Sequence, residues 1–123
     1  MKLLESGEMY LETILQLKNK FGYVRSIDIA RELNYSKPSV SRAVALLKED
    51  GYITHDPHGM ILLTEKGYEI ADKILDRHTT LTKYLMSLGV SEETAQNDAC
   101  RIEHIISQES FDKIKEQLEK TLK

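Results

Sequence analysis

The chain has 123 residues, of which 41% are hydrophobic and 30% are charged, and its formal net charge is −3. This length suits one or two small domains with a hydrophobic core. No apolar run reaches the roughly 18 residues that a membrane span requires, and an acid as early as Glu5 argues against a secretory signal. The single cysteine, Cys100, excludes an internal disulfide and fits a reducing compartment. We therefore expect a cytoplasmic protein without membrane contact.

The charges are distributed unevenly along the chain. Residues 1–63 hold eight Lys or Arg and eight Asp or Glu, whereas residues 64–123 hold nine and twelve. The bulk charge excludes a strongly basic nucleic-acid binder. Any contact with nucleic acid should therefore be local and should lie in the first half of the chain.

Helical periodicity dominates the opening segments. Apolar residues at steps of three and four predict helices over about residues 5–20, 26–33 and 37–50. The expected end signals are N-caps at Ser26 and Ser36, a left-handed C-cap at Asn34, and Pro38 early in the third helix. Small Ala30 would let the second and third helices cross closely.

The pattern then changes to a hairpin and returns to helices. Residues 52–55 and 60–63 are short β-prone runs, separated by the turn sequence Asp-Pro-His-Gly at 56–59. Thr64 can cap a long helix to about Leu88, and Ser91 can cap another. A last helix carries an apolar stripe formed by Phe111, Ile114, Leu118 and Leu122. The predicted fold is mainly α, with one domain over residues 1–63 and a second over residues 64–123.

Two short helices joined by a tight turn and followed by a hairpin indicate a winged helix-turn-helix domain. The second of these helices opens with hydroxyl and basic residues and holds no acid before Glu49, which suits phosphates and base edges in a DNA major groove. The expected DNA-contacting residues are Ser26, Ser36, Lys37, Pro38, Ser39, Ser41, Arg42 and, at the wing tip, His58. A winged helix that contacts only protein is the alternative. One winged-helix unit holds few cations, so tight binding of double-stranded DNA should require two units. We therefore expect a homodimer on a palindromic site.

The sequence Cys100-x-x-Glu103-His104 places a thiol, a carboxylate and an imidazole at helical spacings of three and four. These are transition-metal ligands. The same spacing also suits a small buried cysteine beside a solvated acid and histidine, so spacing alone leaves both interpretations open. Three more potential ligands, Met9, Glu12 and His78, are each explained as readily by packing or surface charge. Their occurrence together with the first three favours a metal site.

Several motifs in order resemble the diphtheria toxin repressor family of metal-activated bacterial repressors. They are residues 8–12 (EMYLE), 36–41 (SKPSVS), 63–67 (LTEKG), 77–78 (RH) and 97–104 (NDACRIEH). The resemblance covers essentially the whole chain. It implies a winged helix-turn-helix domain followed by a helical dimerisation and metal-binding domain. The chain is similar in length to the manganese transport regulators, which lack the SH3-like domain of the longer iron-type members.

The resemblance also implies a mixed set of metal ligands. Met9 and Cys100 match the iron-type members, Glu12 and His78 match the manganese type, and Glu103 and His104 match both. Thr82 and Gln96 stand where the iron type has a Glu and a His of its ancillary site, so a complete ancillary site is not expected.

Sulfur ligands favour Fe²⁺ over Mn²⁺, which prefers oxygen, and Co²⁺, Ni²⁺ or Zn²⁺ are expected to substitute in vitro. We therefore predict an Fe²⁺-dependent repressor of metal uptake and homeostasis genes that binds no small organic ligand. The alternatives are a Mn²⁺-responsive regulator of the same fold, a redox-sensing regulator using Cys100, a metalloenzyme and a protein-only adaptor. An enzyme is not expected, because the sequence offers no spare general base and no signal of a substrate pocket.

Overall fold

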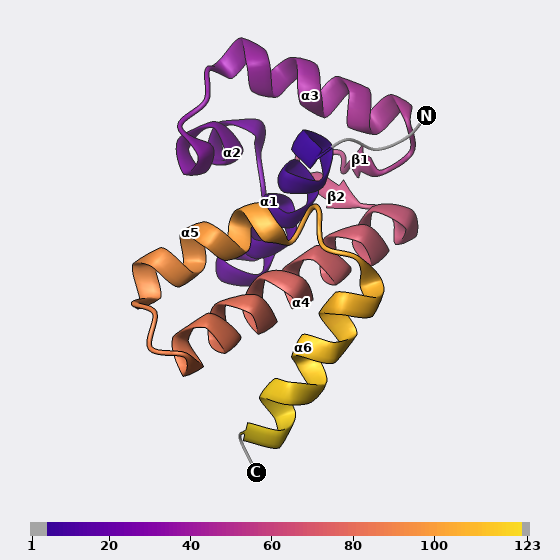
Figure 1. Ribbon diagram of the computed structural model, residues 1–123. Coiled ribbons are helices and arrows are strands. Elements are labelled where there is room, and N and C mark those ends of the chain that lie inside the picture. The colour runs from indigo at the N-terminus through magenta and orange to yellow at the C-terminus, as the bar shows by residue number, and fades with distance from the viewer. Residues whose placement is uncertain (1–4, 122–123) are drawn as a thin grey trace. The chain divides into compact units, whose positions relative to one another are not determined.

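A computed structural model describes residues 5–121 (Figure 1). The chain forms two compact units, the first ending at Asp72 and the second beginning at Lys73. Within the described residues, the helices and strands are α1 (Glu5–Phe21), α2 (Ser26–Leu33), α3 (Lys37–Glu49), β1 (Ile53–His55), β2 (Ile61–Leu63), α4 (Glu65–Ser87), α5 (Glu92–Ile102) and α6 (Gln108–Thr121). The predicted order of three helices, a hairpin and three helices is confirmed. None of the described helices is long and apolar enough to cross a bilayer.

The first unit is a helix-turn-helix with a hairpin. Helix α1 packs against α2, α3 and β2. The side chains at their junction are fully or almost fully buried, among them Leu11, Ile14, Val24, Ile29, Val40 and Ile61. Ala30, at 7% exposure, lies in the same core and permits the close crossing of α2 and α3 that its size predicted.

The ends of α2 and α3 depend on particular residues. Asn34 adopts the left-handed conformation, with φ 57°, and so ends α2 in the predicted manner. Ser36 caps α3, because its Oγ accepts a hydrogen bond from the Ser39 amide at 3.3 Å. The predicted cap at Ser26 is wrong by one residue. Arg25 is the N-cap of α2, and the Asp28 carboxylate accepts its backbone N–H at 2.9 Å.

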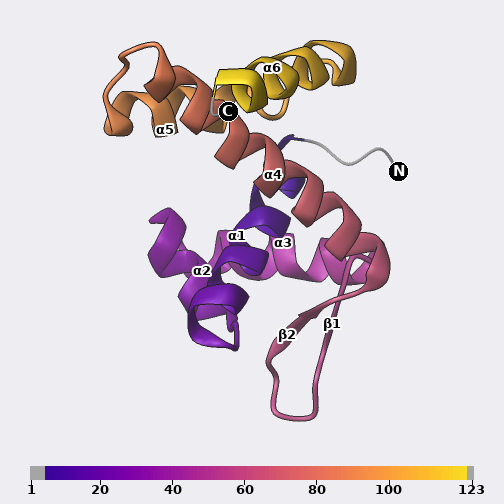
Figure 2. The same cartoon turned by 90° about the horizontal axis from the view of Figure 1, so that it is seen from below.

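The hairpin pairs β1 and β2 antiparallel, with Thr54 opposite Leu62. Its loop projects well beyond α1 to α3, as a wing does (Figure 2). Asp56 holds the turn, because its carboxylate accepts the backbone N–H groups of His58 and Met60 at 2.8 and 2.9 Å. These bonds hold the pKa of Asp56 below its usual range, with Met60 as the main cause.

The second unit consists of most of α4 with α5 and α6. Leu81, Ala99 and Phe111, one from each helix, form its buried centre, and Ile102, Ile106 and Ile114 pack against them. Figure 1 shows α5 and α6 beside α4. Phe111 and Leu118 of the last apolar stripe are buried, whereas Leu122 lies outside the described residues. The predicted end of the long helix at Leu88 overshoots by one residue, since α4 ends at Ser87 and Leu88 is 64% exposed.

Candidate metal centre and nucleic-acid interface

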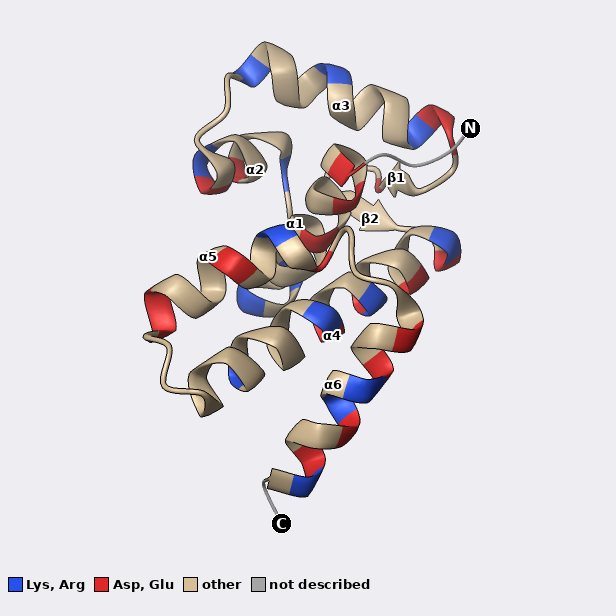
Figure 3. Ribbon diagram, in the orientation of Figure 1, with Lys and Arg blue, Asp and Glu red and all other residues tan. Residues whose placement is uncertain are grey.

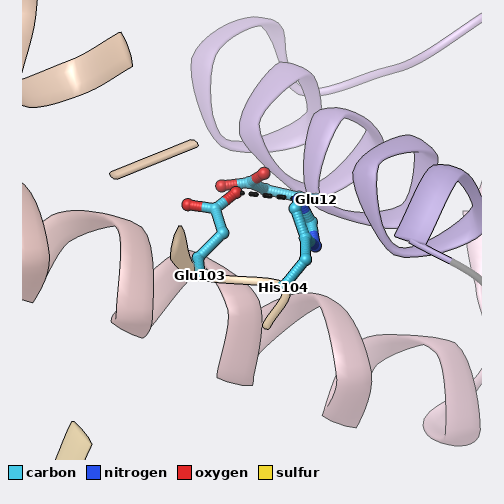
Figure 4. Close-up of side chains that lie close together, drawn as sticks. All are labelled: Glu12, Glu103 and His104. Carbon is cyan, nitrogen blue, oxygen red and sulfur yellow. Dashed lines mark ion pairs between the residues drawn. The ribbon is translucent and has the colours of Figure 1, made fainter. Parts of the chain in front are cut away.

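The centre of the candidate metal site in the second unit is the carboxylate of Glu103. Its side chain is completely buried, although carboxylates are almost never buried without partners. Its Oε2 lies 2.8 Å from His78 Nδ1 on α4, and its Oε1 lies 3.3 Å from His104 Nε2. Figure 4 shows the Glu103 carboxylate and the neighbouring His104 imidazole. One buried carboxylate thus has an imidazole on each of its oxygens.

Helix α5 ends earlier than the sequence pattern suggested. The spacing of Cys100, Glu103 and His104 predicted that all three lie on one helix. In the structure α5 stops at Ile102, Glu103 is its C-cap, and His104 follows in the turn. Glu103 still donates its N–H to Ala99, but its own carbonyl oxygen, like that of Ile106, accepts a hydrogen bond from Arg77 Nη1 of α4, which favours the end of α5 at this point.

These groups have the chemistry of a transition-metal site. Two ligands on one ion lie about 3 Å apart, because each metal–nitrogen or metal–oxygen bond measures about 2.1 Å. The carboxylate–imidazole separations are of this size, and Glu103 and His104 belong to a group of side chains that could hold a metal ion. The residues present therefore fit a divalent cation.

The remaining predicted ligands are on helices of both units. Cys100 lies on α5, one turn before Glu103, and is half-buried. Met9 and Glu12 lie on α1 in the first unit, where Glu12 is 5% exposed. Met9 lines a hollow of about 360 Å³ together with Tyr10 of α1 and Tyr35 of the turn between α2 and α3.

Arg77 also lies at this site, although the sequence indicated it only as part of the 77–78 motif and gave it no role. It is 7% exposed, and its Nη1 donates to the carbonyl oxygens of Glu103 and Ile106. An arginine directly before His78 on a helix with an apolar stripe was the only sequence signal that could have indicated this role.

The candidate DNA-contacting residues gather on the first unit. Ser26 of α2 and Lys37 and Ser41 of α3 line one hollow of about 250 Å³. Pro38 and Arg42 are exposed on α3, and His58 is exposed at the wing tip. Figure 3 shows basic residues along α3, with acidic residues only at its end.

Hydroxyl groups at the start of α3 form a local chain. Ser36 Oγ donates to Ser39 Oγ at 2.8 Å, and Arg42 reaches the same Ser39 oxygen at 3.4 Å. These donors surround the positive end of the α3 dipole, where phosphate groups are favoured.

Two family models match the chain almost end to end. Residues 2–61 match the N-terminal DNA-binding domain of iron-dependent repressors, and residues 64–122 match their metal-binding and dimerisation domain. A helix-turn-helix transcriptional regulator of Methanocaldococcus jannaschii, itself uncharacterized, is 38% identical over 118 residues, which is 94% of each chain. The chain belongs to the iron-dependent repressor family.

Other relatives agree with this membership. The regulator MntR of Bacillus subtilis is 38% identical over 89% of this chain and 77% of its own. The solved manganese regulator SloR superposes with a TM-score of 0.81 at 25% identity, covering 97% of this chain. The crystal structure of IdeR from T. acidophilum superposes with a TM-score of 0.80 at 26% identity, covering 97% of this chain. The chain spans about half the length of these two structures, 55% and 56%.

Family membership confirms the coarse sequence prediction. The chain is a metal-dependent, DNA-binding transcriptional regulator with a winged helix-turn-helix and a helical metal-binding and dimerisation domain. Members of this family are regulators rather than enzymes.

Proposed function

We propose that the chain is a cytoplasmic Fe²⁺-responsive repressor that binds a palindromic operator as a homodimer and controls genes of metal uptake and homeostasis. The proposed ligands are Met9, Glu12, His78, Cys100, Glu103 and His104. The observation that carries the proposal is the buried Glu103 carboxylate between two imidazoles, with a cysteine one turn away on α5. A buried carboxylate and two imidazoles supply hard and borderline donors, and the thiolate supplies a soft one.

The choice of metal rests on the sulfur donors. Oxygen ligands suit Mn²⁺, whereas a thiolate and a thioether shift the preference toward Fe²⁺, Co²⁺, Ni²⁺ and Zn²⁺. Mn²⁺ is the second candidate, because the structurally similar SloR is a manganese regulator. Zn²⁺ would bind more tightly than Fe²⁺ at equilibrium, so availability and geometry would have to select iron in the cell.

The proposed coupling of metal to DNA follows from where the ligands lie in the sequence. Met9 and Glu12 belong to α1, which packs against α2 and α3 of the reading unit. His78, Cys100, Glu103 and His104 belong to the second unit. A bound divalent cation supplies positive charge that neutralises the acidic and thiolate ligands of both units. Shared ligation would favour the DNA-competent arrangement, and by linkage DNA would raise metal affinity by the same factor.

The DNA-binding half of the proposal uses the exposed start of α3. Lys37 and Arg42 would contact phosphates, and Ser39 and Ser41 are placed on a helix whose opening residues read base edges in this fold class. Ser26, Ser36 and Pro38 would border the same surface, and His58 would approach the backbone from the wing. We place the functional division between DNA reading and metal sensing near residue 63.

The proposed dimer forms through the second unit. Among the described residues of this unit, the exposed large apolar side chains are Met86, Leu88 and Ile105. Exposed apolar groups of this kind are typical of protein–protein contacts when they lie together. A dimer would present two α3 helices to successive major grooves.

The decisive experiment measures operator affinity under anaerobic conditions as Fe²⁺ or Mn²⁺ is titrated. We expect Fe²⁺ to tighten binding, and a Glu103→Gln variant to lose this response while keeping weak metal-free binding. Glu116→Gln, an exposed acid on α6, is the matched control and should behave as the wild type. A different result would favour redox sensing over metal sensing. In that case operator affinity would not change with either metal, it would change with peroxide, and the peroxide response would be lost in Cys100→Ser.

A further inference from the structure

Arg77 is a buried cation that donates hydrogen bonds to residues 103–108, a segment that carries two proposed metal ligands. Its Nη1 donates to the carbonyl oxygens of Glu103 at 3.1 Å and of Ile106 at 3.0 Å. Its Nη2 donates to Gln108 Oε1 at 3.0 Å. The guanidinium therefore spans the connection from the end of α5 to the start of α6.

The carbonyl oxygens that accept hydrogen bonds from Arg77 belong to the C-cap of α5, Glu103, and to Ile106 in the connection before α6. The last carbonyls of a helix lack intrahelical donors, and buried ones are costly when unsatisfied. A planar guanidinium with five donors in fixed directions can satisfy several of them at once. An ammonium or an apolar side chain at this position could not hold the same set of carbonyls.

The guanidinium is itself held in place. Gln108 donates its Nε2 to Asp112 at 2.8 Å, which turns its oxygen toward Arg77. The Arg77 Cζ lies 5.6 Å from the centre of the Phe111 ring, within the range of a cation–π contact. Arg77 is thus fixed from α6 as well as from the turn.

Consecutive residues of α4 hold Glu103 from its two ends. Arg77 binds its backbone carbonyl, and His78 contacts its carboxylate at 2.8 Å. We propose that Arg77 is the positioning residue of the metal centre, which holds the 103–106 turn so that Glu103 and His104 are arranged as ligands before any ion binds. This inference rests on the proposed metal-dependent function and adds a residue to it that contacts no metal.

The positioning role of Arg77 sets the size of the expected loss in metal affinity. Groups that orient metal ligands typically account for 10–100-fold in metal affinity, because without them the ligands must be ordered at the moment of binding. Arg77→Met keeps most of the side-chain length and packing but removes every donor. It should therefore weaken binding of Co²⁺, used as an air-stable probe of the site, by roughly 10–100-fold.

The matched control is Lys115→Met. Lys115 of α6 forms an exposed ion pair with Asp76 of α4 at 2.9 Å, so this variant also removes a cation that links the same two helices. The Lys115–Asp76 pair lies outside the 103–106 turn, so the Co²⁺ affinity of this variant should stay within about twofold of the wild type.

A second readout needs no metal. In the metal-free protein, amide hydrogen exchange at residues 103–107 should be faster in Arg77→Met than in the wild type, while the amides of α1 to α3 exchange as before. A general loss of stability would instead accelerate exchange throughout both units. Equal Co²⁺ affinity, or unchanged exchange in the turn, would overturn the proposal.

A third readout covers the case in which Arg77→Met does not fold. In the wild-type apoprotein, the Arg77 guanidinium protons should give separate, slowly exchanging NMR signals at low temperature, because three acceptors hold them. A single averaged signal would overturn the positioning role. Wild-type protein that binds no Co²⁺ would overturn the proposed function instead, and the exchange and NMR results would still decide whether Arg77 orders the turn.

Discussion

His78 Nδ1 lies 2.8 Å from Glu103 Oε2, although 25 residues separate them in the sequence. The pair joins the middle of α4 to the C-terminal end of α5, and the carboxylate is completely buried. The contact brings an imidazole and a carboxylate to one point, where both could bind a divalent cation.

Removal of the Glu103 charge should abolish tight metal binding. Glu103→Gln keeps the size of the side chain but leaves a neutral amide between His78 and His104. We expect at least a 100-fold loss in Co²⁺ affinity, since this ligand would contribute more than an orienting group does. Isothermal titration at constant pH measures it, and retention of wild-type affinity would exclude Glu103 from the site.

Exchange of the two proposed sulfur ligands should change the preferred metal. The double variant Met9→Asp with Cys100→Asp replaces soft donors by oxygen, which suits Mn²⁺. The Mn²⁺ concentration that half-activates operator binding should fall relative to that of Fe²⁺, as measured by fluorescence anisotropy of labelled DNA. If the ratio of the two midpoints is unchanged, the sulfur atoms do not select the metal.

Cations at the start of α3 should contribute electrostatically to DNA affinity. Lys37→Ala and Arg42→Ala should each weaken binding to every sequence and lower the slope of log affinity against log salt by about 1. Lys113→Ala on α6 is the control, because this exposed residue pairs with Glu116 in the second unit. An equal slope in all four proteins would place the phosphate contacts elsewhere.

Gly67 should tolerate no side chain. A Cβ at this position would overlap the carbonyl oxygen of Tyr52, which is backbone and cannot move aside. Tyr52 also accepts the Thr64 N–H at 3.1 Å, so displacement would disturb the start of α4. Gly67→Ala should lower the free energy of unfolding by about 1–3 kcal/mol in urea denaturation. Unchanged stability of the variant would show that the hairpin and α4 can move apart with little loss of free energy.

The wing turn should loosen in acid. Hydrogen bonds from Met60, and then from His58, lower the pKa of Asp56 below its ordinary 3.8. A carboxylate whose pKa is lower in the folded than in the unfolded protein stabilises the folded state. This contribution is fully present above the unfolded pKa of 3.8 and is lost as the pH falls through the lower pKa of the folded state. The amide shift of Met60, whose N–H is the main cause of the lowered pKa, should therefore report the loss of this hydrogen bond below pH 3.8. Asp56→Ala should show the loosened shifts at every pH.

Local signals in the sequence were sufficient for most element boundaries. Asn34 ends α2 in the left-handed conformation, because its short amide tolerates a positive φ, and Ser36 caps α3 because its hydroxyl reaches the free Ser39 amide. Ser26 is the exception, because it is not the N-cap of α2. Arg25 precedes the helix and Asp28 completes the cap, which sequence preferences for serine do not foresee.

The sequence by itself determined the helices and the wing, because each depends on residues within a few positions of one another, whereas the metal ligands it indicated stay a prediction. Only the tertiary structure decided that α5 ends before His104, that the buried Glu103 carboxylate meets His78, and that Arg77 supports the turn. These contacts join residues 25 or more positions apart. Their energies depend on burial and on the directions of donors and acceptors, which exist only once α4, α5 and α6 have packed.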